Sequence, residues 1–470
     1  MDIVGESSVL HHREDLVAYE CDGFTLKKGH AKAVVFPKNT EEVAKVVKYL
    51  NAKKLPFLAR GAGTGLSGGA IPLGGEVIIS LARMKKLLKV DYDNLYALVE
   101  PGYINLKLTH SITDKGYYYA PDPSSQSACT IGGNIAENAG GAHCLKYGVT
   151  TNHVLGLEVV LPNGEVVNIG GEGIPDMPGY DLLGILTGSE GTMGIVTKIT
   201  VRILKNPETK KTILAYFDDV EDASQAVSDI IAAGIVPAAL EMMDKVAIKA
   251  VEAANYPVGH PKDLAALLLI EVDGIAAGID GQVEEILDVC RNRNVREVKA
   301  ARDEKERAAW WANRKTGFGA MGAISPDYLV QDGVIPRSRL PEVLRRINQI
   351  SEETGLKIAN IFHAGDGNLH PLVLFDEKKP GDIEKALKAG SDCLKACADA
   401  GGTITGEHGV GIEKKEEMRF VFTDDELEAQ INIREVFNPE DLLNPGKLFP
   451  TPSRCAEVKQ ELKKQEKSLA

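Results

Sequence analysis

The stretch RGAGTGLSGGA, Arg60–Ala70, holds five glycines in eleven residues and follows the apolar run LPFLA, which is typical of a β-strand. Glycine is costly in a folded chain unless its conformational freedom is used. A loop of this kind lets backbone N–H groups approach phosphate oxygens closely. The stretch therefore predicts a phosphate-binding loop, although a purely structural glycine turn would have the same composition.

The spacing of these glycines separates the loop from two familiar nucleotide-binding motifs. It does not have the form of a G-x-G-x-x-G motif opening a long helix, which a Rossmann NAD site requires. No Gly-Lys-Ser/Thr sequence follows, so the loop is not a P-loop. The sequence thus argues against bound NAD.

Short alternating elements surround the loop. A strand is expected at 33–37, a helix at 39–54 with Thr40 as its N-cap, and further strands at 55–61 and 76–81, which together form a β-α-β unit. Strand, helix and strand follow in 96–121, a hairpin in 154–171 and a long strand in 194–207. Beyond Pro207 the order strand, helix, strand recurs three times, which predicts α+β repeats around an antiparallel sheet.

Composition limits the class of protein. A chain of 470 residues predicts two or more domains, and a net charge of -13 argues against nucleic acid and anionic membranes as partners. No run approaches the roughly 20 apolar residues of a membrane span, and the N-terminal residues lack a signal-peptide core. The seven cysteines are irregularly spaced, and Cys393 and Cys397 fit one buried helix face. Reduced thiols in a cytoplasm are the simplest account.

Two further loops share the character of the first. Residues 120–150 are rich in Gly, Ser and Asn, and their prolines and glycine pairs predict an irregular backbone, while residues 186–196 are a similar stretch of small residues. Three separated small-residue loops suit a ligand with extended contacts, so a dinucleotide is favoured over a single phosphate.

Two histidines bracket a turn in NIFHAGDGNLHP, residues 360–371. The Gly-Asp-Gly-Asn turn breaks a helix, so the segment predicts a hairpin across which His363 and His370 face each other. Paired imidazoles are common metal ligands. The alternative is that His370 is an ordinary strand residue and His363 supports the turn.

These motifs carry a resemblance to a known family. The runs at 60–65, 121–125, 132–134, 138–141 and 188–191 closely resemble the vanillyl-alcohol-oxidase-like FAD-binding domain. HAGDGNLH, GEHGVGIEKK and NPGKLF resemble the C-terminal domain of the FAD-linked D-lactate dehydrogenase and glycolate oxidase group. The match covers about residues 15 to 450, with the motifs in the same order.

The resemblance implies an α+β protein with four segments. A two-part FAD-binding domain is expected at 1–206, and a substrate and metal (cap) domain with an antiparallel sheet at 207–415. Residues 416–450 should pack back on the FAD domain, and 451–470 should form a charged tail.

The resemblance also implies FAD, with its pyrophosphate on the loop of residues 60–67. The first loop contains no His or Cys, so noncovalent binding is expected, while His143 and Cys144 in the second loop leave covalent attachment open. The expected contacts are Arg60, Gly61, Ala62, Gly63, Thr64, Gly65, Ser67, Pro121, Asp122, Ser125, Gly132, Gly133, Asn134, Asn138, Gly141, Gly188, Glu190, Gly191, Ile195 and Asn444.

For the metal, the resemblance implies the ligands His363, His370 and Glu407, a set suited to Fe²⁺, Zn²⁺ or Mn²⁺. An exposed polar turn is the alternative for the Glu407–His408 pair. His408 is the expected general base. Arg314 in WWANRKTGF is expected to hold the substrate carboxylate. A surface arginine with a packed stem is the alternative for it, and Arg60 is a weaker candidate.

The implied activity is oxidation of a small D-2-hydroxy acid to the 2-oxo acid, by hydride transfer to flavin N5. D-lactate is the first expected substrate, with glycolate and D-2-hydroxyglutarate as alternatives. Electrons should leave through a soluble protein, either an electron-transfer flavoprotein or an iron–sulfur subunit, with the acidic surface and the tail as docking elements. An electron-transfer subunit without substrate chemistry and a metallohydrolase are the competing classes.

Overall fold

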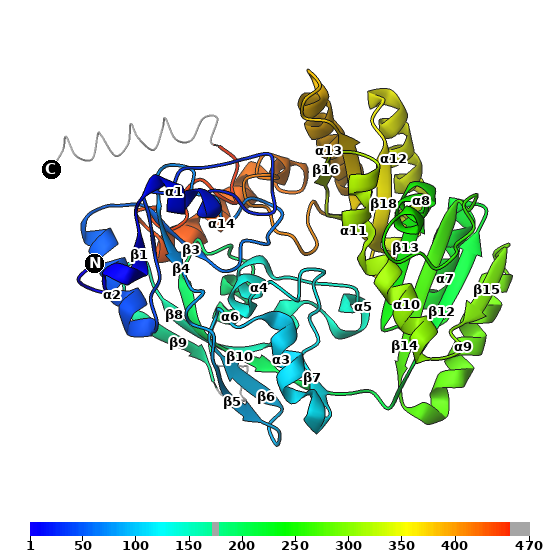
Figure 1. Cartoon of the computed structure of the whole chain (residues 1–470), viewed down its shortest axis with the longest axis horizontal. Helices are drawn as coiled ribbons and strands as arrows, with labels where there is room; N and C mark the ends of the chain where they lie inside the picture. The colour runs from blue at the N-terminus through cyan, green and yellow to red at the C-terminus, as the bar shows by residue number, and fades with distance from the viewer. Residues whose placement is uncertain (172–177, 452–470) are drawn as a thin grey trace.

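The computed structural model describes residues 1–171 and 178–451. Figure 1 shows two bodies of mixed helix and sheet side by side. Residues up to Lys205 and the C-terminal segment build one body, and the middle of the chain builds the other. The predicted mixture of α and β structure is confirmed. The predicted tail from 452 onward lies outside the described residues.

The glycine-rich loop leaves a small sheet with strand order β1-β2-β4-β3. β2 and β3 run parallel to β4, and α2 connects β2 to β3. Asn39 caps α2 by accepting a hydrogen bond from the Glu42 amide, so the prediction of Thr40 as N-cap is wrong. Asn39 is extended and Thr40 is already helical. The elements are β1 (Val9–Leu10), β2 (Ala33–Val35), α2 (Thr40–Ala52), β3 (Phe57–Arg60) and β4 (Val77–Ser80).

A second, antiparallel sheet has the strand order β5-β6-β10-β8-β9. Its strands are β5 (Leu87–Asp91), β6 (Tyr96–Val99), β8 (Val154–Val160), β9 (Val166–Gly170) and β10 (Ile195–Arg202). The associated helices are α3 (Asn105–Ile112), α4 (Ile131–Glu137), α5 (Cys144–Tyr147) and α6 (Leu182–Leu186). β7 (Tyr117–Tyr118) pairs with β11 (Leu204–Lys205) apart from this sheet.

The prediction of an irregular backbone for residues 120–150 is wrong in part, because α4 and α5 lie within this segment. The Thr130 side chain caps α4 by accepting from the Gly133 amide. The glycine pair at 132–133 therefore sits in the first helical turn, where capping outweighs the low helix propensity of glycine.

The other body is built on a nine-stranded sheet, and the antiparallel pairing predicted for this region is confirmed. The strands are β12 (Thr209–Phe217), β13 (Ala239–Asp244), β14 (Ala266–Gly274), β15 (Glu297–Ala300), β16 (Asp327–Val330), β17 (Gly333–Val334), β18 (Ile358–His363), β19 (Asn368–Leu369) and β20 (Pro371–Phe375).

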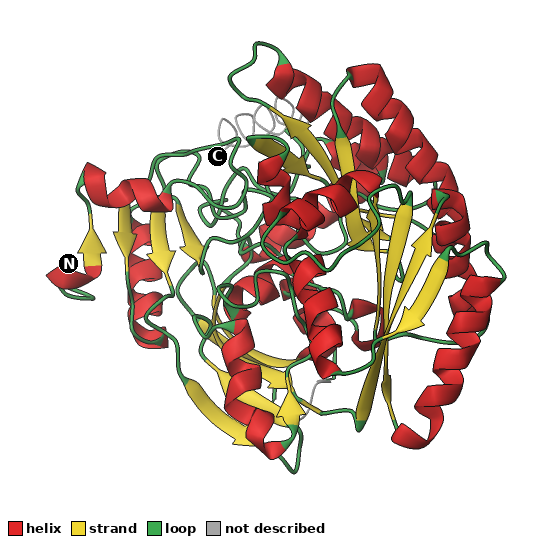
Figure 2. Ribbon diagram, turned by 45° about the vertical axis from the view of Figure 1, so that its right-hand side comes forward, coloured by secondary structure: helices red, strands yellow, loops and turns green. Residues whose placement is uncertain are grey.

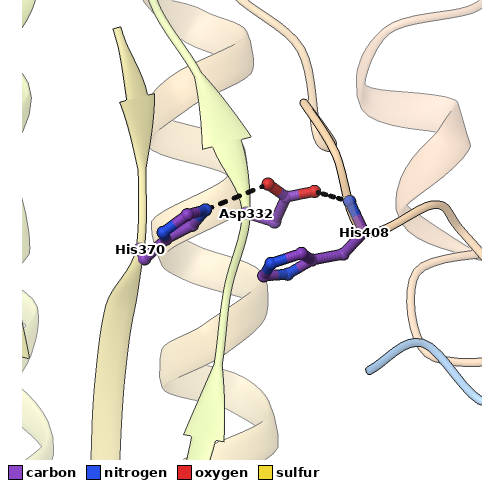
Figure 3. Close-up of side chains that lie close together, drawn as sticks. All are labelled: Asp332, His370 and His408. Carbon is purple, nitrogen blue, oxygen red and sulfur yellow. Dashed lines mark hydrogen bonds and ion pairs between the residues drawn. The ribbon is translucent and has the colours of Figure 1, made fainter. Parts of the chain in front are cut away.

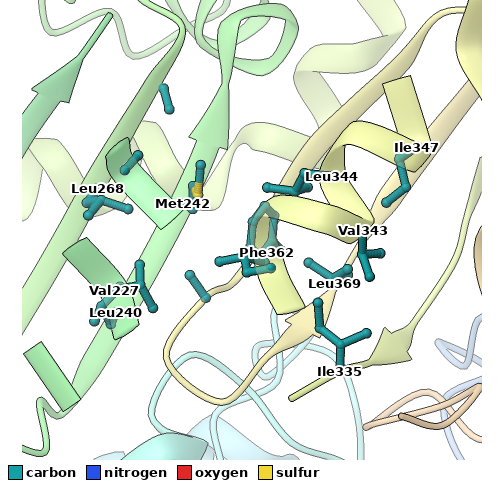
Figure 4. Close-up of a cluster of buried hydrophobic side chains, with 14 of the residues drawn as sticks. Val227, Leu240, Met242, Leu268, Ile335, Val343, Leu344, Ile347, Phe362 and Leu369 are labelled. Carbon is teal, nitrogen blue, oxygen red and sulfur yellow. The ribbon is translucent and has the colours of Figure 1, made fainter. Parts of the chain in front are cut away.

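Helices cover both faces of this sheet (Figure 2). One face packs on α7 (Val220–Ala232), α9 (Ala276–Arg291), α12 (Leu340–Thr354) and α13 (Asp382–Asp399). Figure 4 shows part of that core. The other face packs on α8 (Lys245–Ala253), α10 (Glu304–Lys315) and α11 (Gly317–Ala320).

Side-chain alternation assigns each residue of the central strands to one face. On β13, Leu240 and Met242 belong to the first core, whereas Ala239 and Met243 belong to the second. Glu241 therefore points towards the α8 and α10 side. It is paired in register with His363 on β18, which fixes a carboxylate beside that histidine.

The C-terminal segment returns to the first body. The Phe57 amide donates to the Leu442 carbonyl, and the Asn444 amide donates to the Phe57 carbonyl. α14 (Asp424–Phe437) precedes this contact. Cys393 and Cys397 lie buried on one face of α13, as predicted. Among the described residues, no helix combines the length and apolarity needed to cross a membrane.

Candidate functional site

A cleft with about 1470 Å³ of space outside protein atoms, part of it open to solvent, is lined by all three glycine-rich loops. Glu407 and His408 close one part of it, and Phe318 of α11 also lines it. The cleft thus brings together the first body, the loop after α13 and the helical layer of the second body.

The first glycine loop is shaped by its own arginine. Arg60 is buried, and its guanidinium donates to the backbone carbonyls of Tyr19, Cys21 and Ala70. Gly63 has φ +71°, a conformation that favours glycine. Since Arg60 is used in fixing the loop, the structure gives little support to the weaker suggestion that it binds substrate.

Most predicted cofactor contacts line this cleft. They are Arg60, Gly61, Ala62, Gly63, Thr64, Gly65, Ser125, Gly132, Gly133, Asn134, Glu190, Gly191 and Ile195. The other predicted positions, which are not among the lining residues described, are Ser67, Pro121, Asp122, Asn138, Gly141, Gly188 and Asn444.

Several of those other positions hold the loops together. The Ser67 hydroxyl lies 2.9 Å from the carbonyl oxygens of His408 and Gly409, so it ties the glycine loop to the His408 turn. Asn444 donates from Nδ2 to the carbonyls of Gly69 and Glu190. Ser67 and Asn444 therefore hold the loops in place.

The predicted hairpin is present, and it brings the two histidines together. β18 ends at His363, which pairs with Asn368 across the turn, and His370 follows β19. The imidazole centroids are 5.0 Å apart. Nε2 of His363 and Nε2 of His370 lie 3.3 Å and 3.4 Å from the same atom, Oε1 of Glu407. The three side chains offer a set of donor atoms that could hold a metal ion.

His370 provides a direct test of whether this set fits a cation. Its side chain is about 1% exposed, its Nδ1 has no hydrogen-bond partner among the described residues, and its Nε2 has only the contacts of 3.4 Å to the carboxylates of Asp332 and Glu407. Burying unpartnered nitrogen is costly unless a ligand satisfies it. Burial lowers the pKa of His370 below its ordinary value, so the imidazole is neutral, the form that binds metals.

The carboxylate of the set is ionised. Burial alone would raise the pKa of Glu407, but His363, His408 and His370 together hold it well below its usual range. Burial would likewise lower the pKa of His363, but Glu241 and Glu407 raise it well above the ordinary value. An anionic oxygen with two imidazoles is a donor set suited to a divalent cation.

Glu241, which the sequence analysis did not identify, is the second partner of His363. Its Oε1 lies 2.7 Å from His363 Nδ1, and its Oε2 accepts from Arg314. A carboxylate on the far nitrogen fixes the tautomer and orientation of a metal-binding histidine. Only the strand register reveals this pairing, because 122 residues separate Glu241 from His363.

Arg314 lies on α10, and its guanidinium is largely buried beside Glu241. Its Nε has no hydrogen-bond partner among the described residues. The arginine predicted to hold a substrate carboxylate therefore retains an unused donor, while its other side is engaged by Glu241.

Asp332 is a further residue that the sequence analysis missed. Its carboxylate accepts from the amides of Gly406, Glu407 and His408 and from the Thr405 hydroxyl. Its Oδ1 also lies 3.4 Å from Nε2 of His370. Figure 3 shows it between His370 and the backbone of His408.

His408 lies against the donor set. Its ring stacks on His370 with centroids 4.9 Å apart, and its Nδ1 has no partner among the described residues. Burial would lower the pKa of His408, but Asp332 and Glu407 raise it. Asp332, His370 and His408 also form a second group whose donor atoms lie close enough to hold a cation.

The second glycine loop contacts the second body through His143. Its Nδ1 lies 2.8 Å from Asp122 Oδ2, its Nε2 lies 3.6 Å from Glu271 Oε1, and its ring stacks on Trp311. Both ring nitrogens thus face carboxylates.

Two family models match the chain. Residues 31–170 match the FAD binding domain, and residues 206–448 match the C-terminal domain of FAD linked oxidases.

The chain is also similar to complete curated proteins. The glycolate oxidase subunit GlcD of Escherichia coli K12 is 45% identical over 449 residues, which span 96% of this chain and 90% of that protein. The same subunit of Bacillus subtilis is 38% identical over 93% of each chain. A D-lactate dehydrogenase of Archaeoglobus fulgidus is 35% identical over 88% of this chain and 90% of its own.

Solved structures share the fold at low identity. The 4-ethylphenol oxidase of Gulosibacter chungangensis superposes with a TM-score of 0.78 at 19% identity, over 97% of this chain and 96% of its own. The p-cresol methylhydroxylase gives a TM-score of 0.78 at 18% identity, over 95% of each chain. The predicted vanillyl-alcohol-oxidase-like fold is confirmed.

Proposed function

The chain belongs to the FAD-linked oxidase family of glycolate oxidase subunits and D-lactate dehydrogenases, and from this we propose that it oxidises a small 2-hydroxy acid to the 2-oxo acid. One observation carries the proposal: the His363–His370–Glu407 donor set lies at the edge of the same cleft that the FAD-binding loops line.

FAD fits the cleft by the character of its lining. A Cβ added at Gly61 would lie 2.5 Å from Thr130 Oγ1, so the first two loops approach each other at a glycine. The lining of glycines, small side chains and exposed amides suits a dinucleotide. The residues proposed to hold it are those of the three loops, and the binding is proposed to be noncovalent.

His363, His370 and Glu407 are the proposed ligands of one divalent ion, Fe²⁺, Zn²⁺ or Mn²⁺. When bound, the two cofactors supply a two-electron acceptor and a Lewis acid that polarises the substrate hydroxyl. Glu241 contributes by orienting His363, and Asp332 contributes by holding the turn that carries Glu407.

His408 is the proposed base. It lines the cleft next to Glu407, so a 2-hydroxy acid held at the donor set would present its hydroxyl proton to this imidazole. Arg314 is the proposed partner of the substrate carboxylate, through the Nε that Glu241 does not use. A charge-assisted hydrogen bond there would orient the α-carbon towards the cleft.

Electrons must leave the cofactor after each turnover. We propose that they pass to a soluble protein partner, an electron-transfer flavoprotein or an iron–sulfur subunit, because the glycine loop lacks the NAD fingerprint. Relatives at 45% and 38% identity are named as subunits, which supports a partner here. The second candidate is an electron-transfer subunit without substrate chemistry. That function does not explain why His408 lies beside the metal donor set.

The test is anaerobic titration of the purified yellow protein with glycolate, D-lactate and D-2-hydroxyglutarate, followed by the flavin absorbance. Glycolate and D-lactate form the critical pair, because relatives of both names match the chain. We expect one of the three to bleach the flavin within the mixing time of a manual assay.

Matched variants separate the roles. His370→Ala should lose metal and bleaching but retain FAD, whereas His408→Ala should retain both and bleach about 10²- to 10⁴-fold more slowly. Arg314→Lys should raise the substrate concentration needed for half-bleaching. No bleaching by any 2-hydroxy acid in protein that holds both FAD and metal would rule out the proposed activity.

A further inference from the structure

Besides Glu407, the cofactor cleft is lined by Glu137 and Glu190, whose surroundings differ. Glu190 adopts φ +50°, and its two oxygens accept from the amides of Val410 and Gly411 at 2.6 Å and 2.7 Å. Glu190 therefore fixes the turn after His408. Glu137 is the last residue of α4, and its Oε2 is buried with no hydrogen-bond partner among the described residues.

Glycines leave the space that the Glu137 carboxyl occupies. A Cβ at Gly409 would lie 2.3 Å from Glu137 Oε2, and a Cβ at Gly69 would lie 3.0 Å from Glu137 Oε1. Gly409 also has φ +81°, which disfavours a side chain. The Glu137 carboxyl therefore lies between the proposed phosphate-binding loop and the turn that follows His408, and it contacts both.

Within residues 1–171 and 178–451, no cation forms an ion pair with Glu137. Lys414 donates to the Gly409 carbonyl and lies 3.2 Å from Ser67 Oγ and from Glu413 Oε2. Lys447 donates to the carbonyl of Ile71 and to Oδ1 of Asn444. Both ammonium groups are buried and committed to these partners, so they act on Glu137 only through space.

The remaining charges near Glu137 are negative. Burial is the largest influence raising the pKa of Glu137 well above its usual range, and Glu190 and Asp22 raise it further against the attraction of Lys414 and Lys447. A bound FAD would add its anionic pyrophosphate to this surrounding. In the part of the chain that the structure describes, an ionised Oε2 would thus have no hydrogen-bond donor and no directly paired cation.

We propose that Glu137 keeps its proton and, as a neutral carboxylic acid, donates a hydrogen bond to an acceptor atom of FAD. A protonated carboxyl has one O–H donor, which needs an acceptor, and Glu137 lines the cleft in which FAD would lie. The bound cofactor supplies that acceptor. The inference depends on FAD binding alone and stands apart from the identity of the substrate.

The experiment measures FAD affinity of the apoprotein by fluorescence quenching from pH 6 to pH 10. Glu137→Gln keeps a neutral donor, so its affinity should match the wild type near neutral pH. Glu137→Ala should bind about 10-fold more weakly, which is the effect of one hydrogen bond. The wild type should lose affinity at high pH as Glu137 ionises, while Glu137→Gln should not lose it.

Infrared difference spectroscopy gives a second readout. A protonated carboxyl stretching band should be present in the holoprotein and absent from Glu137→Gln. Glu284→Gln, at an exposed position on α9, is the matched control and should leave both readouts unchanged. An affinity of Glu137→Gln as weak as that of Glu137→Ala, together with a missing carboxyl band in the wild type, would overturn the proposal. A failure of 2-hydroxy acids to bleach the flavin would leave both readouts intact.

Discussion

At the scale of single residues, Asp332 organises more of the site than any residue identified from sequence. Its carboxylate accepts from three consecutive amides, of Gly406, Glu407 and His408, so it fixes the backbone that carries a proposed metal ligand and the proposed base. Burial would raise the pKa of Asp332, but His408, His370 and Lys414 hold it well below its usual range. The site thus depends on a residue outside every motif.

Asp332→Asn should retain FAD and lose metal affinity. The amide oxygen can still accept from the turn, but the amide NH₂ then points at His370 Nε2 and competes with the cation for it. Loss of such supporting groups costs about 10- to 100-fold in metal affinity. Metal content after dialysis against chelator is the measurement. Asp399→Asn, at the exposed end of α13, is the control, and equal metal retention in both variants would contradict the assigned role.

The sequence could not reveal Asp332 or Glu241. His363, His370, Glu407 and His408 stand in recognisable runs, so their chemistry could be predicted before their positions were known. Asp332 stands in QDGVIP, where nothing distinguishes it from a turn residue, and Glu241 stands in an apolar strand. Their roles arise from pairing between distant segments, which residue type alone does not encode.

At the scale of elements, the hairpin between β18 and β19 sets the spacing of the two histidines. Gly367 lies in its turn with φ +80°, and its carbonyl accepts from the Ile335 amide. A Cβ there would lie 2.1 Å from the Ile335 carbonyl oxygen. The turn therefore has both a conformational and a steric need for glycine.

Gly367→Ala should lower the apparent thermal midpoint more than Gly381→Ala and should also release metal. Gly381 has nearly the same backbone conformation, φ +83°, but no atom of the described residues lies within 4 Å of an added Cβ. Strain alone costs about 1–2 kcal/mol, and the backbone collision at Gly367 adds to it. Calorimetry with metal analysis tests this, and equal losses in the two variants would show that the contact with Ile335 does not matter.

Elements with strong periodicity were predictable, and those shaped by capping were not. α2 has buried valines at helical spacing, and β14 begins with the apolar run ALLLI, so both were recognised as helix and strand. α4 was missed because its first turn contains Gly132 and Gly133, and its start depends on the Thr130 hydroxyl. Propensity is a weak guide where one side-chain hydrogen bond decides.

At the scale of the whole molecule, the two bodies are joined beside the cleft by charged contacts. His143 is the N-cap residue of α5 and Lys146 lies on that helix, whereas Glu271 and Asp273 come from β14 of the other body. Lys146 donates to Asp273, which also accepts from the Tyr147 hydroxyl. Since the proposed FAD-binding loops and the candidate metal donor set lie on different bodies, these contacts help to set how the two halves of the proposed site meet.

His143 makes this junction sensitive to pH. Burial would lower the pKa of His143, but Asp122 and Glu271 raise it to about 10. A histidine whose folded pKa lies above its unfolded value of about 6.5 stabilises the fold fully below that value, and the contribution is lost as pH rises towards about 10. The apparent thermal midpoint of the wild type should therefore fall across this window.

His143→Gln is neutral at every pH, so its free energy of unfolding at low pH should be lower than that of the wild type by about 1.5–3 kcal/mol, the range for a hydrogen bond to a charged group. Its thermal midpoint should also depend less on pH. His110→Gln, at an exposed position on α3, should follow the wild type. Scanning calorimetry from pH 6 to pH 10 makes the comparison. If the thermal midpoints of His143→Gln and the wild type changed equally with pH, the His143 imidazole would not be protonated at this junction.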